Sequence, residues 1–505
     1  MSSHTALPAR LRRWTYLVHR WCGVFGCLLM ALWFASGVVM LFVGYPKLSQ
    51  WQRLQASPAL ADAPYLSPAQ VMGQGDVTRL VLNAASGQPR YGLRDADGRW
   101  STVDAVTGRI PAALDDAGAL RSAHVFLPGV SAHALGAVWE DRWTHSRALD
   151  AHRPLRQVQM DDAARTLLYV SSATGAVVMQ ATLGERAWNF VGAWLHWLYV
   201  FKNQPVDPVW TWTVIGLSAG CVLVACSGIL VGLWRWRFSR PYRSGSRSPF
   251  AAGWMRWHHL LGLSFAAVTL TWIFSGLMSM NPLGIFSASV APDLAAYAGS
   301  TPARHLALAP QSMLRALQAQ GFTAVELEWR NLDGSPYVLA RDAADRSRII
   351  TQSEGQLQVA AQWPRARLES AAAHLYRAPL ASSQWLTAYD SYYYRRDEQS
   401  MMGGSERRLP VLMLQFADAG RSQVYIDVAT GQVELSVDRA QRVGRWLFSL
   451  LHSWDLRPML AIAWLRQTVL VVLSAGGLLL AVSGVVIAWR RTRRSLRARR
   501  ASEPA

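Results

Sequence analysis

Four long apolar runs divide this chain of 505 residues. They lie at about residues 20–43, 211–234, 258–280 and 467–489. Each run is long enough to cross a bilayer as a helix, which takes about 20 apolar residues. The intervening stretches 44–187 and 281–441 are long and of mixed polarity, whereas 235–257 is short and polar. The pattern predicts a membrane protein with a four-span α-helical bundle and two large domains outside the bilayer.

Within the two long stretches, short alternating apolar segments flank residues that favour tight turns. Glycine in these turns supplies the positive φ that a tight hairpin needs. The expected hairpins lie at residues 103–110, 169–177, 349–357 and 425–433. Helical patterns at 311–320 and 367–375 precede the last two. We therefore expect α+β domains, with two small helix-plus-sheet units in each long stretch.

Basic residues are concentrated at the ends of the apolar runs. Segments 1–20, 235–256 and 490–505 carry +16 of the net charge of +19. Because positive clusters beside membrane spans face the cytoplasm, we expect both termini and the short stretch inside, and the two long stretches outside. The rest of the chain is nearly neutral, which argues against a nucleic-acid surface. Only 16% of residues are charged, which excludes a disordered protein.

Parts of the sequence recur at fixed spacing without gaps. Residues 19–37 align with 258–276, and 195–228 align with 451–484, so that histidines and Ser-Gly pairs coincide. We infer an internal duplication in which each half has an outgoing span, an outer domain, an interfacial helix and a returning span. Both halves run in the same direction, which predicts a parallel repeat about the membrane normal. The repeat also makes a cleaved signal peptide an unsuitable interpretation of the first run.

Several kinds of site are excluded by the sequence. All four cysteines lie inside predicted spans, so no disulfide framework holds the outer domains. No C-x-x-C-H motif is present for covalent haem attachment. The cytoplasmic segments are too short for a nucleotide-binding domain.

Five of the twelve histidines lie at or in the predicted spans. Glycines share helical faces with His19 and His258, which leaves room for a flat macrocycle, although small residues also serve close helix packing. The repeat places His19 and His258 near the cytoplasmic face, and His196 and His452 near the outer face. Haem iron accepts axial imidazoles, and haem b needs no covalent anchor. We therefore predict two haem b groups, one in each leaflet, with His19, His196, His258 and His452 as iron ligands.

A fifth histidine follows one of these ligands directly. His259 is turned from His258 by about 100° on a helix, so both cannot easily ligate one iron. The repeat places His259 over Arg20. We predict that Arg20 and His259 contact haem propionates.

Three motifs carry a family resemblance: His19-Arg20-Trp21 through Ser36-Gly37, Trp257-His258-His259 through Ser275-Gly276, and the segment 445–453. With these motifs the sequence resembles the PepSY-associated transmembrane family of bacterial inner membranes. The resemblance implies PepSY-like domains in both outer stretches and an inner-membrane location. Some family members are similar to haem-b reductases that release iron from siderophores.

The predicted organisation has eight parts in chain order. They are the cytoplasmic N-terminus and first span (1–43), a periplasmic PepSY-like domain (44–187), an interfacial helix and second span (188–237), a cytoplasmic loop (238–257), the third span (258–280), a second periplasmic PepSY-like domain (281–441), an interfacial helix and fourth span (442–490), and a cytoplasmic tail (491–505).

The leading functional hypothesis is an inner-membrane di-haem b reductase. It would pass electrons across the membrane to a periplasmic acceptor, which the resemblance implies is ferric siderophore iron. A membrane quinol or a docked cytoplasmic reductase would be the donor. One alternative is a non-enzymatic, membrane-anchored PepSY regulatory or binding module. Another is a siderophore or iron uptake permease, which the scarcity of Asp, Glu and Lys in the spans disfavours.

Overall fold

The computed structural model describes residues 9–72, 77–204, 206–299, 309–397, 400 and 407–501. The chain forms two compact units. The membrane unit comprises the residues up to Gly44, Trp188–Ser287 and the residues from Ala440 on. The sheet unit comprises Tyr45–Ala187 and Ala288–Arg439. The predicted cytoplasmic tail is partly described, since 502–505 lie outside the described residues.

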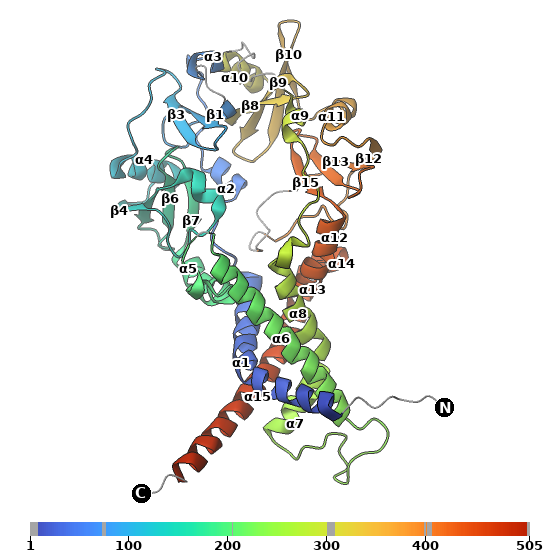
Figure 1. The fold of residues 1–505 in the computed structure, drawn as a ribbon. Coiled ribbons are helices and arrows are strands. Elements are labelled where there is room, and N and C mark those ends of the chain that lie inside the picture. The colour runs from blue at the N-terminus through green and yellow to red at the C-terminus, as the bar shows by residue number, and fades with distance from the viewer. Residues whose placement is uncertain are drawn as a thin grey trace. The chain divides into compact units, whose positions relative to one another are not determined.

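Long apolar helices make up the membrane unit. Three of them are long and apolar enough to cross a bilayer: α1 (Ala9–Phe42), α6 (Pro208–Arg235) and α15 (Ala463–Ala501). The pair α7 (Trp254–Ser264) and α8 (Ala266–Ser279) is a fourth candidate. α1 packs against α6 and α15, and α6 packs against α8 (Figure 1). The chain is therefore a membrane protein with three to four apolar spans.

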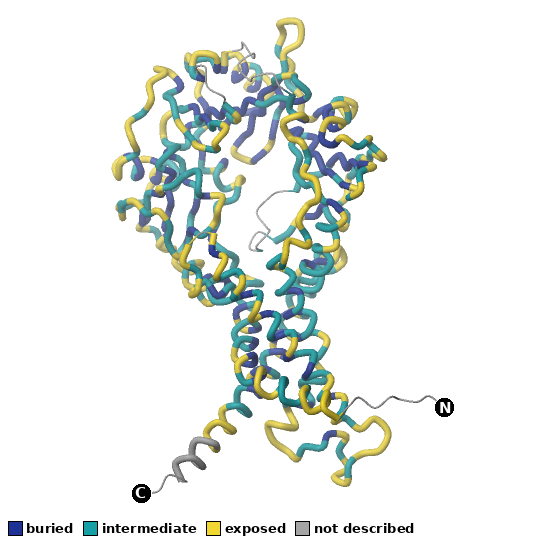
Figure 2. Tube along the Cα trace, viewed as in Figure 1, coloured by how far each residue is buried: buried dark blue, intermediate teal, exposed yellow. Residues whose placement is uncertain are grey.

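Apolar side chains on the outside of these helices fit a lipid environment. On α1, Trp21, Phe25 and Leu28 are all more than half exposed. In Figure 2 the helices of this unit carry buried residues on their inner faces and exposed ones elsewhere. This distribution is expected when lipid, rather than water, covers the outer surface.

The predicted third span is bent rather than straight. The axes of α7 and α8 differ by 69°, and the break falls at Phe265. The ring of Phe265 lies where a Cβ on Gly476 would be only 2.1 Å away. At the aligned position α1 has Gly26 and runs without a break. The bend therefore coincides with a close approach of the Phe265 ring to Gly476 that α1 does not have at Gly26.

The segments that lead into α6 and α15 contain similar elements in the same order. α5 (Leu183–Asn189) continues into the π-helix η2 (Phe190–Trp194), and η3 (Tyr199–Phe201) follows. The second segment contains α12 (Arg439–Arg445), the π-helix η6 (Trp446–Leu450), α13 (Leu451–Ser453) and α14 (Arg457–Ala461). The two π-helices begin 256 residues apart, and so do the left-handed residues Leu198 and Trp454. Single-turn π-helices occur frequently at functional sites.

Three antiparallel sheets form the sheet unit. The first has seven strands in the order β11-β10-β9-β8-β1-β2-β3, and the others have the orders β4-β5-β6-β7 and β12-β13-β14-β15. The strands of the first half are β1 (Val77–Asn83), β2 (Arg90–Asp95), β3 (Trp100–Asp104), β4 (Ala132–Val138), β5 (Leu155–Met160), β6 (Leu167–Ser171) and β7 (Val177–Ala181). Those of the second half are β8 (Ala324–Leu332), β9 (Ser335–Asp342), β10 (Ser347–Ser353), β11 (Gln356–Ala360), β12 (Leu380–Leu386), β13 (Val411–Phe416), β14 (Gln423–Asp427) and β15 (Val433–Val437).

Short helices complete the two units. They are α2 (Gln50–Gln55), α3 (Pro68–Val71), α4 (Asp116–Phe126), η1 (Arg147–His152), η4 (Pro282–Gly284), α9 (Leu294–Ala298), α10 (Pro310–Ala319) and α11 (Arg365–Ala372).

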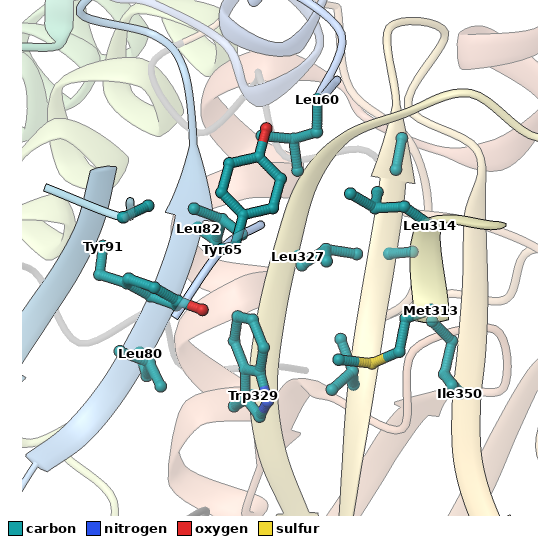
Figure 3. Packing of buried hydrophobic residues seen from close by; sticks show 14 of the residues in the cluster. Leu60, Tyr65, Leu80, Leu82, Tyr91, Met313, Leu314, Leu327, Trp329 and Ile350 are labelled. Carbon is teal, nitrogen blue, oxygen red and sulfur yellow. The ribbon is translucent and has the colours of Figure 1, made fainter. Parts of the chain in front are cut away.

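The two long stretches of the sequence share one sheet instead of forming separate domains. β1 pairs with β8, with Leu80 opposite Trp329 and Leu82 opposite Leu327. These side chains lie in one apolar core with Met313 and Leu314 of α10 (Figure 3). Strands with one apolar face bury it most completely by extending a common sheet, which explains why the two stretches join.

The other face of β8 is ionic. Glu326 and Glu328 alternate with the apolar residues of this strand, and both are buried. Arg341 of β9 binds them at 3.1 and 2.9 Å. Arg53 also pairs with Glu326, and Arg79 with Glu328. Both buried carboxylates are thus paired with arginines, as buried charges require.

Most of the local predictions in the long stretches are confirmed. The hairpins β6–β7, β10–β11 and β14–β15 lie at three of the four predicted positions. α10 and α11 match the predicted helices. The fourth hairpin, at 103–110, forms only its turn, in which Asp104 accepts hydrogen bonds from Val106 and Thr107. The following Ile110 is 81% exposed and belongs to no strand, because it has no apolar surface to cover.

Candidate functional site

Two pairs of histidines face each other inside the membrane unit. His19 of α1 and His258 of α7 have ring centroids 6.2 Å apart, with ring planes at 32°. His196, which follows the π-helix η2, and His452 of α13 also have centroids 6.2 Å apart, with planes at 73°. The two pairs therefore have the same spacing, although each is built from residues more than 200 positions apart. These are the four residues that the sequence singled out as iron ligands.

Each imidazole is held through its Nδ1 atom. His452 Nδ1 lies 3.0 Å from Ser275 Oγ, and that hydroxyl donates its proton to the Trp272 carbonyl at 2.9 Å. Because a hydroxyl has only one proton, Ser275 Oγ accepts the hydrogen bond from His452, so the histidine carries its proton on Nδ1. Its Nε2 then keeps the lone pair, which is the form of imidazole that binds a metal.

The other three histidines have the same tautomer. Two of them donate to a serine whose own proton goes to a carbonyl of its helix: His196 to Ser36 at 3.0 Å and His258 to Ser483 at 2.9 Å. His19 Nδ1 lies 3.2 Å from the Val224 carbonyl, which can only accept. In all four rings the Nδ1 atom is thus the one engaged by the protein, and Nε2 is left for a ligand.

A glycine lies next to each imidazole and leaves room for it. At Gly228, which follows Ser227, an added Cβ would lie only 2.7 Å from His19 Cε1. The other three glycines follow the serines named above. A Cβ added to them would lie at ordinary contact distance from the Cε1 atom of the neighbouring histidine: 3.6 Å at Gly37 from His196, 3.9 Å at Gly276 from His452 and 3.4 Å at Gly484 from His258. In the sequence these Ser-Gly pairs were only a sign of duplication. The sequence signal that could have revealed the role of these Ser-Gly pairs in the site is that they recur together with the four histidines.

The geometry of both pairs suits a metal ion bound between them. A metal–imidazole bond of about 2.0 Å, together with about 1.1 Å from Nε2 to the ring centroid, places two opposed centroids about 6.2 Å apart. Both pairs have this separation. Haem iron takes four ligands from the porphyrin and accepts two axial imidazoles. The residues present therefore fit two bis-histidine haem b sites.

Comparison with known proteins assigns the chain to a family. A model of the PepSY-associated TM region matches residues 16–376. The chain belongs to the PepSY-associated transmembrane family. The matched region contains His19, His196 and His258, whereas His452 lies beyond its end. No curated protein matches the chain.

His259 of this family member has a different environment from the four paired histidines. Its Nδ1 lies 2.8 Å from Ser248 Oγ, and its Nε2 lies 2.9 Å from the Gly232 carbonyl. The rings of Trp236 and Phe250 meet it edge-on. Both ring nitrogens are hydrogen-bonded, so His259 ties the polar segment after α6 to α7, and its predicted contact with a propionate stays a prediction.

Arg20, the other residue predicted to contact a propionate, is exposed on α1. It occupies the helical position next to His19 and so points away from the ring of that histidine by about 100°. Its predicted role stays a prediction.

An apolar layer separates the two pairs in this PepSY-associated protein. On α1, His19 and Ser36, which binds His196, are 17 residues apart, or about 25 Å along a helix. The core between them includes Met30, Phe34 and Trp272, and the rings of Phe34 and Trp272 are 5.9 Å apart. The two pairs therefore lie at two levels of the bundle, with apolar side chains between them.

Proposed function

We propose that this protein is a membrane oxidoreductase that holds two haem b groups. The observation that carries the proposal is the repeated histidine pair, with centroids 6.2 Å apart and every Nδ1 hydrogen-bonded. Haem b, when bound, supplies a one-electron iron couple. Binding of this kind needs two neutral imidazoles at each iron, and the chain offers them twice.

The topology in the proposal follows from charge and repetition. The chain crosses a bacterial inner membrane four times, with the bent pair α7–α8 as the third span. Both termini and the segment 238–257 are cytoplasmic, since the basic clusters lie there. The stretches 44–187 and 281–441 form the periplasmic PepSY-like region. The recurrence of the π-helices after 256 residues supports an origin by parallel duplication.

The chain's own residues perform three tasks in this proposal. Each histidine pair would hold a haem iron through its Nε2 atoms. Ser36, Ser275 and Ser483 accept the Nδ1 protons and so fix the ring orientation and tautomer. The apolar layer around Phe34 and Trp272 keeps water out of the bundle between the pairs. Together they give electrons a route from one side of the membrane to the other.

The electron acceptor in the proposal is ferric iron bound by a siderophore, on the outer side near the His196–His452 pair. The support is the resemblance to haem-b reductases of the family. Reduction of Fe(III) to Fe(II) takes one electron, which matches a one-electron carrier. A membrane quinol or a docked cytoplasmic reductase supplies the electrons on the inner side, near the His19–His258 pair.

Anaerobic reoxidation of the full-length protein tests this proposal. The purified protein, expressed with haem supplied, is reduced with dithionite, freed of excess reductant and mixed with ferric siderophores. We expect rapid haem reoxidation and the appearance of Fe(II), both unchanged in His374→Ala, which alters an exposed histidine of the sheet unit. Haem that reoxidises only with other oxidants would remove the iron assignment. Protein that binds no haem would contradict the oxidoreductase and favour a regulatory module or a permease.

A further inference from the structure

Two buried arginines bind the segment that follows His452. Arg466, in the first turn of α15, is 6% exposed and donates to the carbonyl of Ser453, the residue after the histidine, at 3.2 Å. Arg445, the last residue of α12, is also largely buried and pairs with Asp455 at 3.3 Å. Arg445 further donates to the Asp455 carbonyl at 3.1 Å. Both guanidinium groups are therefore held by residues that follow His452 closely in the sequence, Ser453 and Asp455.

This cluster is not repeated around the partner histidine, His196. The residues 256 positions before Arg445, Asp455 and Arg466 are Asn189, Tyr199 and Trp210, and all three are neutral. Trp210 Nε1 donates to the Trp197 carbonyl at 2.8 Å, the counterpart of the bond from Arg466 to Ser453. The second half has thus replaced an indole by a guanidinium while keeping the same hydrogen bond to the backbone.

The cluster carries its positive charge on guanidinium groups, whereas in the first half an ammonium, that of Lys202, lies over the rings of Tyr199 and Trp210. Arg445 and Arg466 bring two positive charges and Asp455 brings one negative charge, so the three side chains carry a net charge of +1 where their counterparts carry none. A positive charge at the edge of an apolar bundle stabilises an anion that enters there. Arginine binds carboxylates with two parallel hydrogen bonds, which also fix the position of the anion.

We propose that Arg466, supported by Arg445, binds a carboxylate beside His452, and that this carboxylate is a propionate of the haem held by His196 and His452. The inference rests on the proposed function, since it concerns the same haem. It gives the haem of the His196–His452 pair an anchor of its own, whereas Arg20 and His259 were predicted for the haem of the His19–His258 pair. It also makes the two haems unequal, because a positive charge favours the reduced, less positive iron.

The midpoint potentials of the two haems, measured without any acceptor, test the inference. In Arg466→Gln, the potential of one haem should fall and that haem should dissociate about ten- to a hundredfold faster, as the loss of a charge-assisted hydrogen bond implies. Arg466→Lys should restore most of the potential because it keeps the charge. Arg457→Gln, which removes an exposed arginine of α14, is the control and should leave both potentials unchanged.

Reconstitution with haem dimethyl ester, whose propionates are blocked, tests the source of the carboxylate without a mutation. The ester should speed haem loss from the wild-type protein as Arg466→Gln does, and should have no further effect on that rate in Arg466→Gln, because both changes remove one interaction. The ester should raise the potential of the same haem, because it removes negative charge near the iron. Additive effects would overturn the inference. Unchanged potentials with weaker acceptor binding would assign the site to a substrate carboxylate and overturn it as well. Wild-type protein that binds no haem would instead contradict the proposed function itself.

Discussion

Ser275 and His452 are 177 residues apart in the sequence and form a hydrogen bond of 3.0 Å inside the membrane unit. Assigning the serine proton to the Trp272 carbonyl at 2.9 Å makes His452 the donor of this bond, so that its Nε2 keeps the lone pair. An apolar bundle offers few other acceptors for an imidazole proton. One hydroxyl in a span therefore holds the histidine in the tautomer that the proposed haem site needs.

In the proposed function, the serines that bind the histidines tune the potentials of the haems. Ser275→Ala removes an acceptor from His452 Nδ1, which makes the imidazole a weaker donor to ferric iron. The potential of the haem bound at the His196–His452 pair should rise, by the equivalent of about 1 kcal/mol for one hydrogen bond. Redox titration of the purified protein measures it. Ser279→Ala, one turn along α8 and exposed, is the matched control; equal shifts in both variants would contradict a specific role.

Gly228 provides space for His19. An alanine there would bring its Cβ within 2.7 Å of His19 Cε1, so Gly228→Ala should displace the ring and remove one haem of the two. Gly220 lies about two turns earlier on α6, and a Cβ added there would meet nothing within 4 Å, so Gly220→Ala should keep both haems. Haem content per chain checks the pair of variants. Full occupancy in Gly228→Ala would mean that His19 does not bind iron where it now lies.

The two haems should differ in their electron paramagnetic resonance spectra. The imidazole planes of the His19–His258 pair are at 32°, and those of the His196–His452 pair are at 73°. Nearly aligned planes split two iron d orbitals and give a rhombic low-spin signal, whereas nearly perpendicular planes leave them close in energy and give a strongly anisotropic one. The oxidised protein should show one signal of each kind. Two identical rhombic signals would contradict the ring geometry of the second pair.

Acid should destabilise the sheet unit through His152. Burial, and then the positive charges of Arg94 and Arg79, lower the pKa of His152 from 6.5 to about 4. Between these values the unfolded chain takes up a proton that the folded chain refuses, so stability is intact above pH 6.5 and falls as the pH drops toward about 4. Thermal unfolding of the full-length protein at several pH values measures this loss.

A matched pair of variants isolates the effect of His152. His152→Gln should flatten the pH dependence of the melting temperature between pH 6.5 and about 4, since the group that titrates has been removed. His133→Gln, which changes a half-exposed histidine of β4, should leave the dependence as it is. The same slope in all three proteins would show that other groups control acid stability.

The sequence predicted those parts of the fold that depend on local pattern. Apolar runs of span length indicated the long helices, and Gly-containing turns indicated three of the four hairpins, because both signals lie within a few residues of each other. The pairing of β1 with β8 was not predicted, since Leu80 and Trp329 meet across some 250 residues and no local pattern specifies that partner. The bend at Phe265 was likewise not predicted, and there the ring packs against Gly476 of a distant helix.

The candidate site was predicted in its residues but not in its supports. Histidines in an apolar environment stand out in any sequence, and the repeat indicated which of them lie together in space. The roles of Ser36, Ser275 and Ser483 depend on which helices are neighbours, which the sequence alone does not state. Arg466 was missed because it breaks the repeat rather than following it, and a comparison limited to matching positions passes over it.

Haem content of the wild-type protein and of two single variants tests the central claim most directly. The purified, haem-supplied protein should contain two haem b groups per chain. His19→Ala and His452→Ala should contain one each, with the lost haem differing in its spectrum and potential between the two. Wild-type protein without a haem absorption band, or equal loss of both haems in each variant, would contradict two independent bis-histidine sites.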